Sequence, residues 1–99
     1  MGIKNHGINV VGYASLTVTD SAEPLVDIPA KANRAFFTVE TSGLRWRGDG
    51  TAPTSSEGHA LAVNDSISFT GANYRSMLDG ILFITTTSDS AVLKVTYFD

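Results

Sequence analysis

The side chains that could perform nucleophilic chemistry are few in this 99-residue chain and lie far apart in the sequence. A hydrolase triad needs a nucleophile, an imidazole base and an orienting acid. Serine is plentiful, but the only histidines are His6 and His59, and neither belongs to a Gly-x-Ser-x-Gly motif. Cysteine is absent, which excludes disulfides, thiolate catalysis and cysteine-bound metals. We therefore predict that the protein is not an enzyme and has no catalytic residue.

The acidic residues fall mostly in segments that we expect to be turns, where an aspartate usually accepts hydrogen bonds from nearby backbone N–H groups. A paired-carboxylate hydrolase or a calcium site would need several of them to converge. Asp49 with Asp65 or Asp79 could bind calcium if their loops met, but no Asp-x-Asp-x-Asp spacing supports this. The sequence thus predicts no metal and no cofactor.

The most distinctive stretch is residues 44–54, LRWRGDGTAPT, which contains the only tryptophan and two of the seven cationic residues. It begins as a strand with Trp46 on one face and both arginines on the other, and it breaks into a turn at its glycines. Arginines on a strand face commonly make bidentate contacts with a partner protein. We expect Trp46 to be a core residue and Arg45, Arg47 and Asp49 to be protein-interface residues.

Two other interpretations of this stretch remain open. Arg47-Gly48-Asp49 is a tripeptide that integrin ligands present in a turn, although the chain has neither the disulfides nor the leader typical of secreted adhesion proteins. Aromatic rings near arginines can also stack on sugars or on single-stranded nucleic acid. A small carbohydrate-binding module, with Trp46, Tyr74 or Tyr97 as its platform, is therefore an alternative function.

The composition narrows the possible partners. With 42% apolar and 17% charged residues, the chain is expected to be globular and to form one domain. Its net charge of −3 disfavours broad nucleic-acid binding, which needs a basic surface. No apolar run approaches the ~20 residues of a membrane span, and the first residues lack the apolar block of a signal peptide. We predict no nucleic-acid partner and no membrane association.

Alternation of apolar and polar residues with a period of two indicates the elements that would position these side chains. Strands are expected at residues 13–19, 25–29, 34–41, 44–47, 60–63, 66–70, 81–87 and 91–98, with a connection at 71–77 that has room for a helical turn. The turn at Ser42-Gly43 predicts a hairpin between the third and fourth of these strands. The fold class is all-β, an antiparallel β-sandwich or jelly-roll-like fold of about seven to eight short strands. Its structural core is predicted to include Trp46, Phe37, Phe69, Phe83 and Val95.

Residues 1–12 differ from the rest because they contain three glycines around a short apolar patch. Glycine weakens a strand, so this segment is predicted to be either an N-terminal arm that orders against a neighbour or an ordinary edge strand. In both cases Ile8 and Val10 are candidate protein-interface residues. Residues 13–99 are expected to form the single β-sandwich domain.

Residues 45–54, followed shortly by Gly58, resemble a motif of small virion structural proteins of tailed bacteriophages. The similarity continues loosely through residues 81–84 and 92–98, and it covers the chain from about Arg34 onward. Those phage proteins often carry an acidic residue in place of Gly48, so the Arg-Gly-Asp tripeptide looks accidental. The N-terminal third shares no such resemblance.

The resemblance implies a capsid decoration, or cement, subunit that binds the major capsid protein or another virion protein and stabilises the head. Such a subunit would be a homo-oligomer, with a trimer slightly favoured, and would be located in the virion after assembly in the host bacterial cytoplasm. A tail, connector or fibre component of the virion is an alternative that the same resemblance allows.

Overall fold

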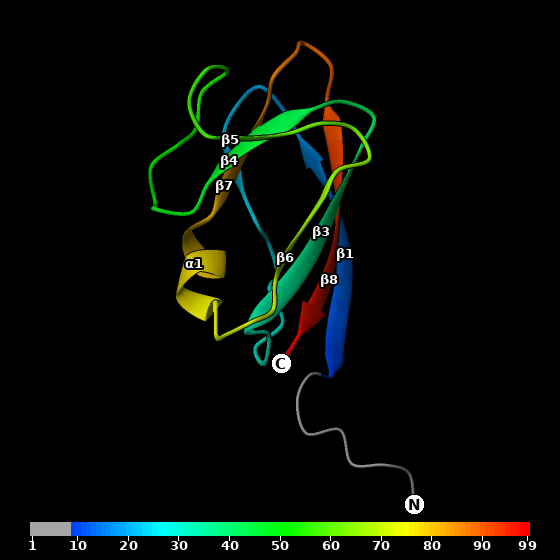
Figure 1. The fold of residues 1–99 in the computed structure, drawn as a ribbon, viewed down its shortest axis with the longest axis vertical. Helices are drawn as coiled ribbons and strands as arrows, with labels where there is room; N and C mark the ends of the chain where they lie inside the picture. The colour runs from blue at the N-terminus through cyan, green and yellow to red at the C-terminus, as the bar shows by residue number, and fades with distance from the viewer. Residues whose placement is uncertain (1–8) are drawn as a thin grey trace, which may run out of the picture.

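The structure is a computed structural model that describes residues 9–99, in which eight strands and one short helix form two packed layers (Figure 1). The elements are β1 (Val10–Val18), β2 (Glu23–Pro24), β3 (Arg34–Glu40), β4 (Leu44–Arg47), β5 (His59–Leu61), β6 (Ser66–Phe69), α1 (Arg75–Gly80), β7 (Leu82–Thr85) and β8 (Ala91–Phe98). No helix in this described part of the chain is long and apolar enough to cross a membrane.

The strands form two antiparallel four-stranded sheets, with the orders β1-β8-β3-β6 and β2-β7-β4-β5. The first strand therefore pairs with the last, the second with the seventh, the third with the sixth and the fourth with the fifth. Nested pairs that are divided between two packed sheets in this way give the strand order of a jelly roll. The predicted all-β sandwich is thus confirmed.

The core lies between the sheets because each long strand turns alternate side chains inward. In β8 the pattern of burial alternates without a break, and its inward residues are Ala91, Leu93, Val95 and Tyr97. Of the predicted core residues, Phe37, Phe83 and Val95 are at most 1% exposed, whereas Trp46 and Phe69 are partly buried and pack against that core. The phenyl ring of Phe37 makes edge-to-face contacts with Phe69 and Phe83, so it links the two sheets.

The two ends of the described chain meet beside β8. The backbone N–H of Asn9 donates to Asp99 Oδ1 over 2.9 Å, and the backbone N–H of Asp99 donates to the Asn9 carbonyl over 3.0 Å. Bonds from Asn9 to the Asp99 carboxylate lower the pKa of that group from its usual value. The Arg34 guanidinium donates to the Asp99 carbonyl and to the Thr70 carbonyl, which ties β3 to the same corner.

The predicted hairpin between residues 36–41 and 44–47 is wrong. β3 pairs with β8 and β6 in one sheet, whereas β4 pairs with β7 and β5 in the other, so the connection crosses between layers. Thr41 has a φ of 78°, a left-handed conformation that turns the chain away from the plane of the first sheet. Both strands then direct their apolar residues toward each other across the core.

The predicted strand at residues 25–29 is also wrong. The second strand is only Glu23–Pro24, and the chain after it forms a loop in which Asp27 has a φ of 53°. Leu25 is nevertheless buried, so its apolar character reflects packing beneath this loop. The helical turn in the 71–77 connection is a six-residue helix that begins at Arg75.

The segment predicted as an arm or edge strand is only partly described. Val10–Gly12 belong to β1, which lies at the edge of its sheet, and Val10 pairs with Phe98. Ile8 lies outside the described residues.

Adjacent residues of β3 provide a test of the register. Phe37→Ala should lower the free energy of unfolding by about 3–5 kcal/mol, because it removes a buried ring that both sheets contact. Phe36, one residue earlier, lies on the outer face and is 37% exposed. Phe36→Ala should therefore lower the free energy of unfolding by less than about 1 kcal/mol. Urea denaturation of both variants measures the difference, and equal losses would show that the register is wrong.

Candidate functional site at the loop between β4 and β5

The loop of residues 48–58, between β4 and β5, begins directly after the two arginines that the sequence singled out. Most of its residues are exposed, but Pro53 is buried and anchors its middle. The backbone N–H of Thr54 donates to the Glu57 carbonyl over 2.8 Å, and the Thr54 hydroxyl accepts bonds from the N–H groups of Ser56 and Glu57. Local hydrogen bonds therefore give this exposed loop a defined shape.

Arg45 holds the far end of the loop against β4. Its Nε donates to the Ser55 carbonyl over 3.1 Å, and its Nη1 donates to the Gly58 carbonyl over 2.7 Å. Gly58 has a φ of 124°, and a Cβ there would lie 3.0 Å from both the Pro53 side chain and the Trp46 carbonyl oxygen. A residue with a side chain would be strained at this position, so glycine is required for the loop to close onto β4.

Arg47 and Asp49 are paired with each other. The Arg47 guanidinium donates twice to the Asp49 carboxylate, at 3.1 and 2.5 Å, and Asp49 Oδ1 also accepts a bond from the Thr51 N–H over 3.2 Å. The hydrogen bond to Asp49 raises the pKa of Arg47, and the bond from Arg47 lowers the pKa of Asp49. The two charged side chains of the Arg-Gly-Asp tripeptide are therefore engaged with each other.

Trp46 lies beneath this loop, and on the neighbouring strand its cross-strand partner is His59. Its ring is 4.7 Å from the His59 ring, centroid to centroid, and makes an edge-to-face contact with Phe69 at 5.4 Å. The indole N–H is buried without a hydrogen-bond partner among the described residues. His59 thus covers one side of the tryptophan ring, and the other side of the ring packs into the protein.

An open cleft of about 690 Å³ runs along the loop. It is lined by Arg47, Gly48, Asp49, Glu57, Gly58, His59 and Met77. Met77, from α1, closes one side, and a Cβ on Gly48 would lie 2.9 Å from its side chain. Among the described residues that line the cleft there is no serine or threonine, so these residues offer an imidazole and two carboxylates but no hydroxyl nucleophile.

The acids that could have formed a calcium site are separately engaged. Asp49 bonds to Arg47, Asp65 accepts the Ala62 N–H over 2.7 Å, and Asp79 accepts from Arg75 over 3.0 Å. Within residues 9–99, no three side chains of the histidine, aspartate or glutamate type gather as a metal site.

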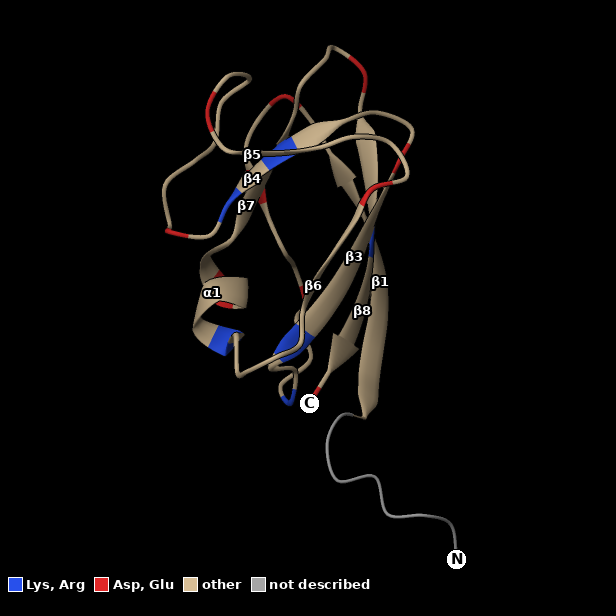
Figure 2. Cartoon of the chain, viewed as in Figure 1, with Lys and Arg blue, Asp and Glu red and all other residues tan. Residues whose placement is uncertain are grey.

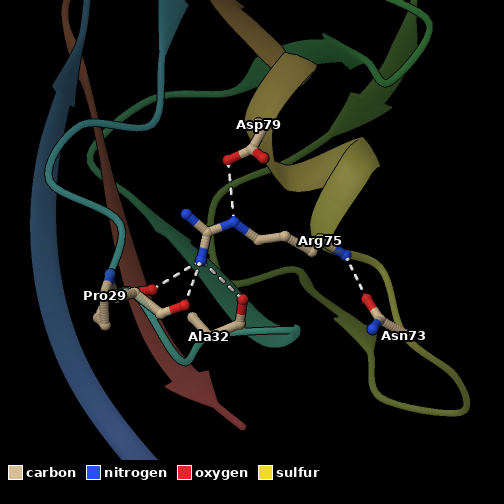
Figure 3. Close-up of polar contacts among 6 residues, drawn as sticks. Pro29, Ala32, Asn73, Arg75 and Asp79 are labelled. Carbon is tan, nitrogen blue, oxygen red and sulfur yellow. Dashed lines mark hydrogen bonds and ion pairs between the residues drawn. The ribbon is translucent and has the colours of Figure 1, made fainter.

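Arg75 is a structural residue that the sequence analysis missed (Figure 3). Its Nη1 donates to the carbonyls of Pro29, Ala30 and Ala32 at 2.7, 3.3 and 2.9 Å, which fastens α1 to the loop before β3. The Asp79 carboxylate, one helical turn on, holds the same guanidinium. The spacing of four between Arg75 and Asp79 was visible in the sequence, but the carbonyl partners were not.

The aromatic residues proposed as a sugar platform do not form one. Tyr97 is 1% exposed in the core, which corrects its assignment to an accessible platform, and burial raises the pKa of its hydroxyl. Tyr74 packs edge-to-face against Phe69 at 5.4 Å. Among the described phenylalanine, tyrosine and tryptophan residues, the exposed ones are instead Tyr13 and Phe36, on the outer face of the other sheet.

Comparison of the chain with models of protein families, with curated proteins and with solved structures finds no match. The local geometry is therefore the basis for assigning a role to this loop.

The Arg47–Asp49 pair predicts a specific titration. Because the bond from Arg47 holds the pKa of Asp49 below its usual 3.8, this pair favours the folded state above that pH, and the contribution is lost as the pH falls through the folded-state pKa. In Arg47→Ala, the pKa of Asp49 measured by NMR should rise toward 3.8. The pKa of Asp99 should stay low, because its cause is Asn9. An unchanged Asp49 pKa would show that the pair does not form.

Trp46 provides a second test, because its ring packs while its N–H is unpartnered. Trp46→Ala should lower the free energy of unfolding by about 3 kcal/mol, through the lost contacts with His59 and Phe69. Trp46→Phe retains most of the ring and removes a buried unpaired donor, so it should stay within about 1.5 kcal/mol of the natural chain. Equal losses in urea denaturation would show that the indole N–H has a partner.

Proposed function

We propose that this chain is a non-enzymatic structural subunit of a bacteriophage virion. In this role it decorates the head by binding the major capsid protein or another virion protein, and it acts as a homo-oligomer. Its mechanism is reinforcement, in which each copy bridges neighbouring capsomers against the pressure of packaged DNA. Many copies on a lattice gain avidity, so each contact can be modest.

The observation that carries this proposal is the preorganised loop of residues 48–58. Arg45 fixes its far end, Arg47 and Asp49 neutralise each other at its start, and Pro53 is buried beneath it. A loop that is already ordered loses little conformational entropy when it binds, which favours association with another protein surface. The same loop carries the resemblance to small virion proteins.

The strand order adds support at the level of the fold. Jelly rolls are common in viral capsid domains and in lectins. This likeness is an analogy of architecture, since one fold supports many functions. Against a lectin-like role, His59 covers the ring of Trp46 and Tyr97 is buried, which leaves the cleft without a flat aromatic platform. A virion subunit fits the packed aromatic residues better.

Binding to empty heads of the encoding phage tests the proposal. The purified chain should attach specifically and saturably, as measured by cosedimentation. Arg47→Ala combined with Asp49→Ala should weaken attachment by about tenfold or more, because it removes the exposed pair that shapes the start of the loop.

Asp89→Ala is the matched control for this experiment, because it changes an exposed acid in a different loop, between β7 and β8. Attachment of this variant should equal that of the natural chain. If the natural chain does not attach to heads but attaches to tails, connectors or fibres, the alternative location in the virion replaces the head. If it attaches to none of them, the virion role is wrong.

A further inference from the structure

β1 is the one long sheet edge in the described part of the chain. It is nine residues long and, among residues 9–99, pairs only with β8, at the border of the sheet β1-β8-β3-β6. The other three border strands, β6, β2 and β5, are four, two and three residues long. An edge strand presents a row of unpaired backbone N–H and C=O groups to another chain.

The register of β1 against β8 shifts between Val10 and Gly12, where a β-bulge can twist an edge away from a partner, but nothing in the sequence from Tyr13 to Val18 blocks such pairing. Monomeric proteins usually protect their edges with charged residues, proline or very short strands. Residues 9–19 contain no Asp, Glu, Lys, Arg or Pro, and Figure 2 shows β1 without a coloured charge along its whole length. By contrast, the border strand β2 consists of a glutamate and a proline.

The most exposed large apolar side chains also lie on this strand. Val10 and Tyr13 are 66% and 65% exposed, more than any other large hydrophobic residue described. Tyr13 pairs with Thr96, and Thr96 pairs with the exposed Phe36, so an apolar and hydroxyl-bearing row crosses the outer face up to the edge. A strand added beside β1 would continue this row and cover Tyr13.

We propose that β1 pairs with β1 of a second copy of this chain, antiparallel and about a two-fold axis, so that two four-stranded sheets join into one. Neither β1 strand carries a charged residue of its own, so the two strands do not repel each other directly; Lys94 of β8 reaches Ser15 Oγ over 3.1 Å on the outer face. An antiparallel arrangement also keeps Asp20, which follows β1, at opposite ends of the interface, whereas a parallel one would place the two Asp20 carboxylates side by side.

The described part of each chain has one such edge, so the association closes at two copies. The inference rests on the homo-oligomer in the proposed function, and it replaces the trimer that the resemblance slightly favoured with a dimer.

The oligomeric state of the purified chain tests this pairing. Size exclusion with light scattering should give a dimer. Thr17→Lys places a charge on the exposed outer face of β1, directly at the interface, and should shift the apparent dissociation constant by at least about tenfold toward monomer. Ser68→Lys adds the same charge to the exposed outer face of β6 and should remain dimeric. A monomeric or trimeric natural chain, or a Thr17→Lys dimer as tight as the Ser68→Lys dimer, would overturn the inference.

Disulfide trapping gives a second measurement that does not depend on weakening the protein. The chain has no cysteine, so single replacements of Tyr13, Ser15 and Thr17 each introduce one thiol on the outer face of β1. A two-fold antiparallel pair brings like residues within bonding distance only next to its axis, so covalent dimers should form at one position or two adjacent positions of this series.

Ser68→Cys is the control and should remain unlinked. Equal linking at all three positions of β1 would mean parallel pairing, and no linking at any of them would mean that β1 is not the interface. Both results overturn the inference.

The head-binding experiment separates this inference from the proposed function. A dimer that links through β1 but does not attach to virions would leave the edge pairing intact and remove the virion role. A chain that attaches to heads as a monomer would keep the virion role and remove both the edge pairing and the homo-oligomer.

Discussion

The fold depends on β8, the last strand in the sequence, which lies inside its sheet between β1 and β3. Its inward residues are buried from Ala91 to Tyr97, and its backbone pairs with both neighbours over nearly its full length. Neither neighbour can complete its ladder until the chain end has arrived, because all these pairings join segments that are distant in the sequence. Folding is therefore expected to be slow relative to proteins of local topology. The bonds of Asn9 and Arg34 to Asp99 fasten that end at the corner where the strand leaves the core.

A second constraint concerns the cations. Four arginines direct their guanidinium groups at partners within the chain: Arg34, Arg45 and Arg75 at backbone carbonyls, and Arg47 at Asp49. These carbonyls belong to loops and chain ends that no sheet ladder satisfies, and a guanidinium with several donors can serve more than one of them. The loops thereby gain a fixed shape. Few cations are therefore left to attract a partner protein, so recognition of that partner would rest on shape and on apolar contact.

The sequence predicted the strands whose alternation is complete, including β3, β6 and β8, and with them the buried positions of Phe37 and Val95. It did not predict which strands pair. The short turn at Ser42-Gly43 suits a hairpin, but β3 pairs with β6 and β8, and the left-handed Thr41 allows the chain to cross to the other sheet instead. Arg45 was predicted as a contact residue from its type and face. Its bonds to the Ser55 and Gly58 carbonyls could not be foreseen, because carbonyl partners have no signature in side-chain identity.

The two surfaces proposed for binding differ in chemistry and in place. The loop of residues 48–58 leaves the sheet of β4 and β5, whereas β1 borders the other sheet, and Figure 1 shows them on opposite sides of the molecule. Pairing through β1 would therefore leave the loop of each copy accessible. Two loops on one dimer, held at a fixed separation by a continuous sheet, would contact two sites on a regular lattice at once, so that the second contact forms at high effective concentration. Dimerisation through β1 would thus strengthen attachment through the two loops without any direct contact between the two surfaces.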